Sequence, residues 1–260
     1  MIKRIISIPL VMLLTVSVFC GGIPSLAKSS DWYIKRNGNE APSFPKDSDM
    51  LAEYNCYFID KKASKDGEKV IYLTFDAGYE NGNVEKILDV LSENDVTAAF
   101  FVLDNLIYKN PELIKRMQRD GHLICNHTKN HKDLSGASKE VIKKDLEALE
   151  EICLDVAGVE MSKYFRFPCG KYSREAIKSV SELGYKTLFW SFAYEDWDNG
   201  KQTGENAAIK KVLENTHDGA VILLHPTSAT NAKIMHRLIT EWKRMGYSFG
   251  TLDELVERNS

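Results

Sequence analysis

Two patterns of hydrophobic and polar positions alternate along most of the chain. Short apolar runs rich in β-branched and aromatic residues predict strands. Longer stretches with apolar residues three and four positions apart predict amphipathic helices. The predicted strands cover residues 70–75, 98–103, 122–125, 164–167, 187–192, 221–224 and 248–252. The predicted helices cover residues 84–91, 111–119, 139–156, 174–183, 207–215 and 232–245.

This alternation predicts an α/β protein with a parallel sheet, because parallel neighbours in a sheet need a crossover connection that is usually a helix. Seven predicted strands favour a closed or nearly closed β/α barrel over an open doubly wound sheet. No G-x-G-x-x-G sequence follows the first predicted strand, which argues against a dinucleotide-binding site.

The amino-terminal part of the chain has a different pattern. Basic residues precede an apolar stretch at 5–19, and a small-residue cleavage sequence ends at Ala27. We therefore expect residues 1–27 to be a secretory signal peptide, with an uncut membrane anchor as the alternative. The irregular segment 28–66 is expected to pack as an extension on the domain formed by 67–260. Export would place the protein outside the cytoplasm, on the cell-wall side of the membrane.

The composition is that of a globular protein, with 260 residues, 43% hydrophobic residues, 27% charged residues and a net charge of −3. The net charge is slightly negative, and the sequence has no cluster of lysines and arginines. It therefore predicts no basic surface for nucleic acid. The cysteines after the leader are Cys56, Cys125, Cys153 and Cys169. They lack the C-x-x-C spacing of zinc ribbons and redox motifs, so buried free thiols are expected. The one alternative is a disulfide between Cys56 and a cysteine of the barrel.

Titratable and cationic residues follow five of the predicted strands at their carboxyl ends. They are Asp76, His127, His131, Arg166, Asp196 and His225. In β/α barrels this end of the sheet carries the active site. Each residue alone has an ordinary explanation, such as a helix cap, a surface charge or a buried histidine. Their convergence on one rim predicts an active site.

The two histidines at this rim are four residues apart. If the segment is helical, His127 and His131 present both imidazoles on one face. Such a pair suits a divalent metal such as zinc. Arg166 lies between two phenylalanines, so its guanidinium is expected to reach inward to a carboxylate.

In this order, the segments resemble the polysaccharide deacetylases of carbohydrate esterase family 4, the NodB-homology domain, over about residues 68–256. The matching motifs are Thr74-Phe75-Asp76-Ala77, His127-Thr128-Lys129-Asn130-His131, Arg166-Phe167-Pro168-Cys169-Gly170, Glu195-Asp196-Trp197 and Leu223-Leu224-His225. The resemblance implies a distorted or incomplete (β/α)7 barrel. It also implies a hydrolase that removes the acetyl group from an amide nitrogen of a polysaccharide.

The resemblance gives each catalytic residue a role. Asp76 would be the general base and Arg166 would orient it. His225 would be the general acid that protonates the leaving amine, and Asp196 would keep it charged.

The resemblance also implies a divalent metal ion as cofactor. His127 and His131 would be its ligands, with zinc favoured and cobalt or manganese as alternatives. Ala77 stands where standard members of the family carry an aspartate ligand, so the ion would be held weakly.

Substrate-binding residues follow from the same motifs. The backbone N–H of Cys169 would stabilise the oxyanion, and Trp197 and Leu223 would shape the pocket for the acetyl methyl group. Tyr79 lies close after the base, where a sugar is expected.

The run of residues 74–82 resembles the branch of the family that makes muramic δ-lactam in the spore cortex. This implies a monomeric enzyme that acts on N-acetylmuramic acid in the glycan strands of peptidoglycan. Two alternatives stay open. One is a deacetylase of N-acetylglucosamine polymers such as chitin or peptidoglycan, and the other is a non-catalytic barrel that binds glycan.

Overall fold

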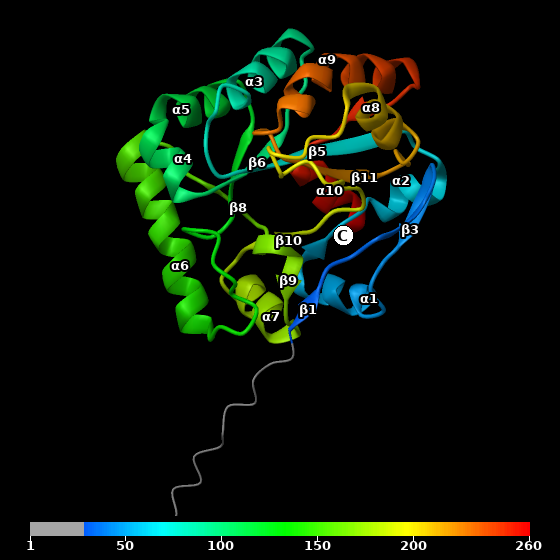
Figure 1. Ribbon diagram of the computed structural model, residues 1–260. Coiled ribbons are helices and arrows are strands. Elements are labelled where there is room, and N and C mark those ends of the chain that lie inside the picture. Colours follow the sequence, from blue (N-terminus) through cyan, green and yellow to red (C-terminus); the bar gives the residue numbers. More distant parts are fainter. Residues whose placement is uncertain (1–28) are drawn as a thin grey trace, which may run out of the picture.

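The computed structural model describes residues 29–260 (Figure 1). The expected leader at 1–27 lies outside these residues. Within residues 29–260, no helix is both long enough and apolar enough to cross a membrane.

A curled parallel sheet forms the centre of the described chain. Its strands are β4 (Cys56–Tyr57), β5 (Val70–Ala77), β6 (Ala99–Val102), β7 (Leu123–Asn126), β8 (Ser162–Phe165), β10 (Lys186–Leu188), β11 (Ala220–Leu224) and β12 (Ser248–Phe249). Their order is β11-β5-β6-β7-β8-β10-β4, and β12 pairs with the first residues of β5. Every pairing in this sheet is parallel, as the strand–helix alternation predicts.

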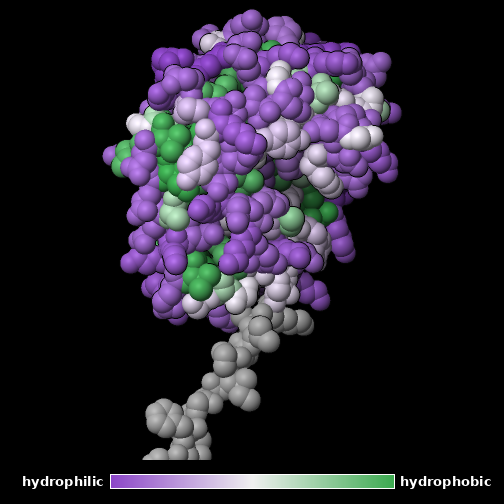
Figure 2. Space-filling view, turned by 60° about the vertical axis from the view of Figure 1, so that its left-hand side comes forward, coloured by the Kyte–Doolittle hydropathy of each residue, from purple (hydrophilic) through white to green (hydrophobic). Residues whose placement is uncertain are grey.

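Helices accompany the sheet, most of them around its outside and α10 at its centre (Figure 1). They are α1 (Ser48–Leu51), α2 (Lys61–Asp66), α3 (Val84–Glu93), α4 (Asp104–Lys109), α5 (Pro111–Arg119), α6 (Lys139–Ile152), α7 (Arg174–Glu182), α8 (Glu205–Leu213), α9 (Ala229–Arg244) and α10 (Leu252–Asn259). A π-helical turn, η2 (Cys153–Ala157), continues α6 and completes the predicted helix 139–156. The surface over α4–α6 is mostly hydrophilic, with separate small apolar patches (Figure 2).

The incomplete barrel expected from the resemblance is confirmed, and one predicted strand explains why it is incomplete. The predicted strand 187–192 divides in two: β10 ends at Leu188, and four residues later Phe192 forms an isolated parallel bridge to Ile222 of β11. Between these points the chain leaves the sheet. The barrel is therefore closed on this side by single bridges and not by a full ladder.

The carboxyl-terminal prediction is partly wrong. The predicted strand 248–252 ends at Phe249, and Leu252 begins α10, whose first turn carries a Thr251–Glu254 capping box. Leu252 and Leu255 pack with inward-facing residues of the sheet, such as Phe101. Helix α10 thus fills the barrel interior at the end opposite the predicted site.

The amino-terminal segment 28–66 contributes directly to the sheet. It supplies β4, which pairs with β10 at the edge of the sheet. It also supplies the short strand β1 (Ser30–Asp31), paired with β9 (Lys171–Tyr172), and the hairpin β2–β3 (Lys35–Asn37 and Glu40–Ser43).

Side-chain alternation along β5 sorts its residues between two apolar clusters. Leu73 and Phe75 pack in the cluster that includes the apolar faces of the outer helices, whereas Tyr72 packs in the barrel interior. Because successive side chains of a strand point to opposite faces, Thr74 and Asp76 also face the interior. Asp76 therefore points into the mouth of the barrel, at the carboxyl ends of the strands.

All four cysteines of residues 29–260 are free thiols. Cys56, Cys125 and Cys153 are buried, as expected, and no disulfide joins Cys56 to a barrel cysteine in this part of the chain. Cys169 differs from the expectation because it is exposed, in a turn at the mouth of the barrel.

Candidate active site

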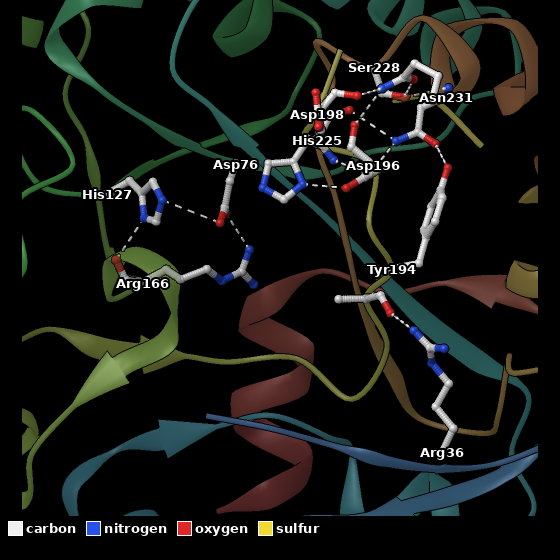
Figure 3. A network of polar contacts seen from close by, with 12 residues as sticks. Arg36, Asp76, His127, Arg166, Tyr194, Asp196, Asp198, His225, Ser228 and Asn231 are labelled. Atoms are coloured by element: carbon white, nitrogen blue, oxygen red, sulfur yellow. Dashed lines mark hydrogen bonds and ion pairs between the residues drawn. The ribbon is translucent and has the colours of Figure 1, made fainter. Parts of the chain in front are cut away.

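A buried ion pair occupies the centre of the mouth. Arg166 Nη1 donates to Asp76 Oδ1 at 2.8 Å, and the guanidinium is fully buried (Figure 3). Its other donors reach Thr74 Oγ1 at 2.9 Å and the carbonyl of Leu188 at 3.1 Å. The guanidinium carbon also lies 4.1 Å from the centre of the Phe101 ring. The inward orientation predicted for Arg166 is what these contacts show.

This environment keeps Asp76 ionised. Burial raises the pKa of the carboxyl group, but the charge that His127 gains in acid, the charge of Arg166 and the hydrogen bond from Arg166 outweigh burial and lower it. Arg166 carries its charge at any physiological pH, so it is the lasting cause of the lowered pKa. Asp76 is therefore ionised at neutral pH.

The two histidines lie next to Asp76, but not on a helix as supposed. Residues 127–131 form a loop in which Thr128 and His131 have φ of 68° and 60°. The loop still brings the ring centres of His127 and His131 to 5.0 Å from each other. His127 Nδ1 donates to the carbonyl oxygen of Arg166 at 2.9 Å, and its Nε2 lies 3.5 Å from Asp76 Oδ2.

Both histidines are suited to bind a cation. Burial lowers the pKa of His127 to about 4 and also lowers the pKa of His131, so both rings are neutral at pH 7. With its Nδ1 proton directed to a carbonyl, His127 keeps the lone pair of Nε2 free toward Asp76, the usual arrangement of a metal-ligating histidine. Within residues 29–260, no three His, Cys, Asp or Glu side chains are gathered as a ready metal cluster. Ala77 is fully buried and belongs to the outer apolar cluster.

A second carboxylate–histidine pair faces this group. His225 Nδ1 donates to Asp196 Oδ1 at 2.7 Å, and the backbone N–H of His225 donates to Asp196 Oδ2 at 2.8 Å. In Figure 3, Asp76 lies between His127 and His225. Burial lowers the pKa of His225, but the hydrogen bond to Asp196 and the Asp196 charge outweigh burial and raise it. The ring therefore keeps its second proton to a higher pH than a free imidazole does.

Sequence patterns did not identify the residue that supports Asp196. Asn231, fully buried in the first turn of α9, donates from Nδ2 to Asp196 Oδ2 at 2.6 Å and accepts from the hydroxyl of Tyr194 (Figure 3). Asn231 follows His225 by six residues, and its position in the first turn of a helix was the only available signal. Thr74 was missed in the same way, although it holds Arg166.

The residues expected to bind substrate occupy the rim. The Trp197 ring lies 5.9 Å from the His225 ring and is 56% exposed, whereas Leu223 is buried in β11 beside Thr74. Tyr79 is 43% exposed, and its hydroxyl accepts from Asn199 Nδ2 at 2.7 Å. Trp197 and Tyr79 therefore present aromatic surface to solvent around the polar centre.

Cys169 is placed by an unusual turn. It adopts φ 55°, in the left-handed region that non-glycine residues seldom occupy, and Gly170 follows at φ 66°. This turn, η3 (Pro168–Gly170), comes three residues after the end of β8, beside Arg166.

Hydrolysis of an amide needs a base that takes a proton from water and an acid that protonates the departing nitrogen. The mouth of the barrel holds an ionised carboxylate and a histidine whose pKa is raised, with neutral imidazoles beside the carboxylate. On fold and site together, the protein is a hydrolase of the carbohydrate esterase type.

Comparison with known proteins identifies the family. The polysaccharide deacetylase model matches residues 63–188. The chain is 36% identical over 228 residues to peptidoglycan-N-acetylmuramic acid deacetylase PdaA of Bacillus subtilis, covering 87% of this chain and 85% of that protein. It is 31% identical over 194 residues to a peptidoglycan-N-acetylglucosamine deacetylase of Bacillus cereus, covering 73% of this chain and 89% of that protein. The chain belongs to the polysaccharide deacetylase family.

Comparison with solved structures agrees with this family assignment. The structure of Bacillus subtilis PdaA, a family 4 carbohydrate esterase, matches with a TM-score of 0.84 and 36% identity, covering 90% of this chain and 99% of that one. A family 4 carbohydrate esterase from Bacillus anthracis matches with a TM-score of 0.72 and 32% identity, covering 89% and 97%.

Proposed function

We propose that this hydrolase removes the N-acetyl group of N-acetylmuramic acid in peptidoglycan and releases acetate and a glycan with a free amine. The observation that carries the proposal is the placement of Asp76 and His225 as base and acid in one mouth. The similarity to PdaA over most of both chains supports the choice of sugar.

Asp76 serves as the general base. Arg166 holds its Oδ1, and this leaves Oδ2 to take a proton from the attacking water. Because Arg166 is itself fixed by Thr74 and the Leu188 carbonyl, the carboxylate has one orientation in the mouth. This role and the roles that follow rest on the geometry and on the family resemblance.

His225 serves as the general acid. Its Nδ1 proton stays on the ring, hydrogen-bonded to Asp196, so the proton on Nε2 is the one given to the leaving amine. Asn231 and the His225 backbone N–H hold Asp196 in the acceptor position. The acid is therefore oriented before substrate arrives, and Asp196 favours its charged form.

The rim residues bind the acetylated sugar. The Cys169 N–H donates to the oxygen that becomes negative when water attacks the carbonyl. Trp197 and Leu223 line the place of the acetyl methyl group, and Tyr79 offers an aromatic face to a sugar ring.

The donor set at His127 and His131 fits a divalent cation, with zinc favoured over cobalt or manganese. When bound, such an ion polarises the acetyl carbonyl and acidifies water. Ala77 provides no ligand, so the affinity is expected to be lower than in relatives with a third protein ligand. Exhaustive chelation should abolish acetate release and added zinc, cobalt or manganese should restore it. Full activity in a protein that elemental analysis shows to be metal-free would contradict this assignment.

The setting of the reaction is the cell-wall side of the membrane, where a monomeric enzyme meets glycan strands. The free amine on muramic acid is the nucleophile from which the δ-lactam of spore cortex forms with loss of water. Export, the monomeric state and the link to the lactam belong to the proposal.

The leading alternative is a deacetylase of N-acetylglucosamine polymers, supported by the Bacillus cereus relative. The decisive experiment compares acetate release from peptide-stripped glycan strands and from chitin oligomers under the same metal conditions, with mass spectrometry to locate the free amines. Amines on muramic acid are expected. Faster release from chitin oligomers would favour the alternative, and binding without any release would favour a non-catalytic glycan-binding barrel.

A further inference from the structure

The amino-terminal extension is hydrogen-bonded to the turn that carries Cys169. Strand β1 pairs antiparallel with β9, which begins directly after that turn. The next residue, Trp32, donates its backbone N–H to the carbonyl oxygen of Gly170 at 2.8 Å. The extension therefore reaches the catalytic mouth, although Trp32 lies outside the part of the chain that the family model matches.

The turn leaves no free space against Trp32. A Cβ atom added to Gly170 would lie 2.9 Å from the Trp190 ring, closer than real side chains approach, and 3.1 Å from the Trp32 Cβ, which is a tight contact. Gly170 also needs its positive φ, which other residues adopt at a cost. The left-handed turn at Cys169 and Gly170 is thus pressed directly against Trp32.

The indole ring of Trp32 contacts the segment that follows β10, whose backbone accepts a hydrogen bond from Arg166. Its ring stacks on Phe189 with a centre-to-centre distance of 4.5 Å and an angle of 5°, and its Nε1 donates to the carbonyl of Trp190 at 2.9 Å. The Phe189 carbonyl accepts from Arg166 Nη2 at 3.4 Å. Trp32 is 5% exposed and lies between these two parts of the site.

We infer that Trp32 is a positioning residue for the reaction: it fixes the Cys169 N–H against the developing oxyanion and steadies the backbone that orients Arg166. This inference rests on the proposed deacetylase function. The amino-terminal extension then contributes to catalysis through Trp32, which contacts neither the substrate nor the cation.

The test compares two identical substitutions. Trp32→Phe keeps an aromatic ring on Phe189 but loses the hydrogen bond to Trp190. Trp242→Phe, in α9, loses an equivalent buried bond from Nε1 to Thr216 Oγ1 at 2.9 Å, away from the mouth. Both proteins are assayed where thermal melts show them fully folded. Trp32→Phe should lower kcat roughly 10- to 100-fold with KM almost unchanged, less than the ~10²–10³-fold cost of removing an oxyanion donor outright. Trp242→Phe should keep the wild-type kcat.

A double-mutant cycle tests the route of the effect. Gly170→Ala should lower kcat by itself, and adding Trp32→Phe should lower it by less than the product of the two separate effects, because both disturb Trp190: the added Cβ meets its ring, and the lost indole N–H had bound its carbonyl. Multiplicative effects would contradict the shared contact.

The outcomes separate the two proposals. An active wild type with a normal kcat in Trp32→Phe, or an equal loss in both Trp→Phe variants, overturns the positioning role alone. A metal-loaded wild type that releases no acetate from any N-acetylated glycan overturns the proposed function, and the positioning role with it.

Discussion

Arg166 is a permanently charged side chain with no solvent exposure, and its partners explain how the fold tolerates it. One carboxylate, one hydroxyl and two carbonyl oxygens accept from it, and Phe101 packs against its face. A buried charge without such partners would cost several kcal/mol. Arg166 thus links the stability of the barrel mouth to the ionisation of Asp76.

Asp76→Asn tests the base directly. The amide removes the proton acceptor while keeping nearly the same shape, so the fold should survive and acetate release should fall at least ~10²-fold. Asp198→Asn is the matched control, because it removes a carboxylate from the exposed rim near Asp196. Near wild-type acetate release by Asp76→Asn would exclude the role.

The sequence identified the charged and titratable residues of this site but not the neutral side chains that hold Asp196 and Arg166. Asp76, Arg166 and His225 were found because they follow strands, and the parallel sheet brings strand ends together. Asn231 and Thr74 were missed because neutral side chains are frequent everywhere, and only the three-dimensional register shows which carboxylate or guanidinium they contact.

Asp196→Asn tests the acid. Asp196 raises the pKa of His225, while Asp76 also raises it and Arg166 lowers it. Without the Asp196 carboxylate, His225 loses its proton at lower pH, so the alkaline limb of the kcat–pH profile should move to lower pH and kcat should fall by ~10²-fold or more. Glu195→Gln, at the exposed neighbouring position, should leave the limb in place. If the alkaline limb of the kcat–pH profile does not move in Asp196→Asn, a group other than His225 produces it.

At the scale of elements, the loop between β7 and α6 shows what spacing alone conveys. The four-residue interval between His127 and His131 did indicate that the rings lie together. The inferred cause was wrong, because two positive φ angles and not a helical turn bring them together. Periodicity also missed α10, since a helix of only eight residues that follows a short apolar run begins like the end of a strand.

His122, at the start of β7, is expected to make the protein sensitive to acid. It is buried, its Nδ1 accepts from the Ala98 N–H, and its Nε2 has no partner among residues 29–260. Burial lowers its pKa from 6.5 to about 4. The stabilisation from a neutral ring is complete above pH 6.5, and as pH falls toward 4 it is lost, by on the order of 3 kcal/mol, since the unfolded chain binds the proton first.

His122→Asn keeps an acceptor for Ala98 but cannot titrate. Urea unfolding at pH 7 and pH 4 should show a smaller loss of unfolding free energy in this variant than in the wild type, even if it is less stable at pH 7. His236→Asn is the control, since His236 is exposed on α9. An equal loss in His122→Asn and wild type would show that His122 does not set the acid sensitivity.

At the scale of the whole molecule, Asp60 joins three distant parts of the chain. This fully buried carboxylate accepts from the Ala63 N–H at the start of α2, from Tyr72 in β5 and from Arg258 in α10. It therefore ties the amino-terminal segment to the sheet and to the helix that fills the barrel.

Asp60→Ala should lower the free energy of unfolding by about 3 kcal/mol, because it removes a helix cap and leaves the Tyr72 hydroxyl buried without its partner. Asp49→Ala removes a solvent-exposed carboxylate that pairs with Lys61 at the surface, and should change stability by less than ~0.5 kcal/mol. Denaturant titration measures both. Similar small losses in the two variants would show that the Asp60 network is not a structural centre.

The contact between Trp32 and Trp190 spans 158 residues of sequence. At a synthesis rate of ~5–20 residues per second, Trp32 is made roughly 8–30 s before the carbonyl that it binds. Throughout that interval the nascent chain carries an indole that is not yet buried and an unpaired strand β4, whose partner β10 also comes late. Long-range closure of this kind is slow and exposes edges that aggregate. Catalytic competence is therefore among the last properties the chain acquires as it matures, and a polypeptide released before residue 190 has no means of acquiring it.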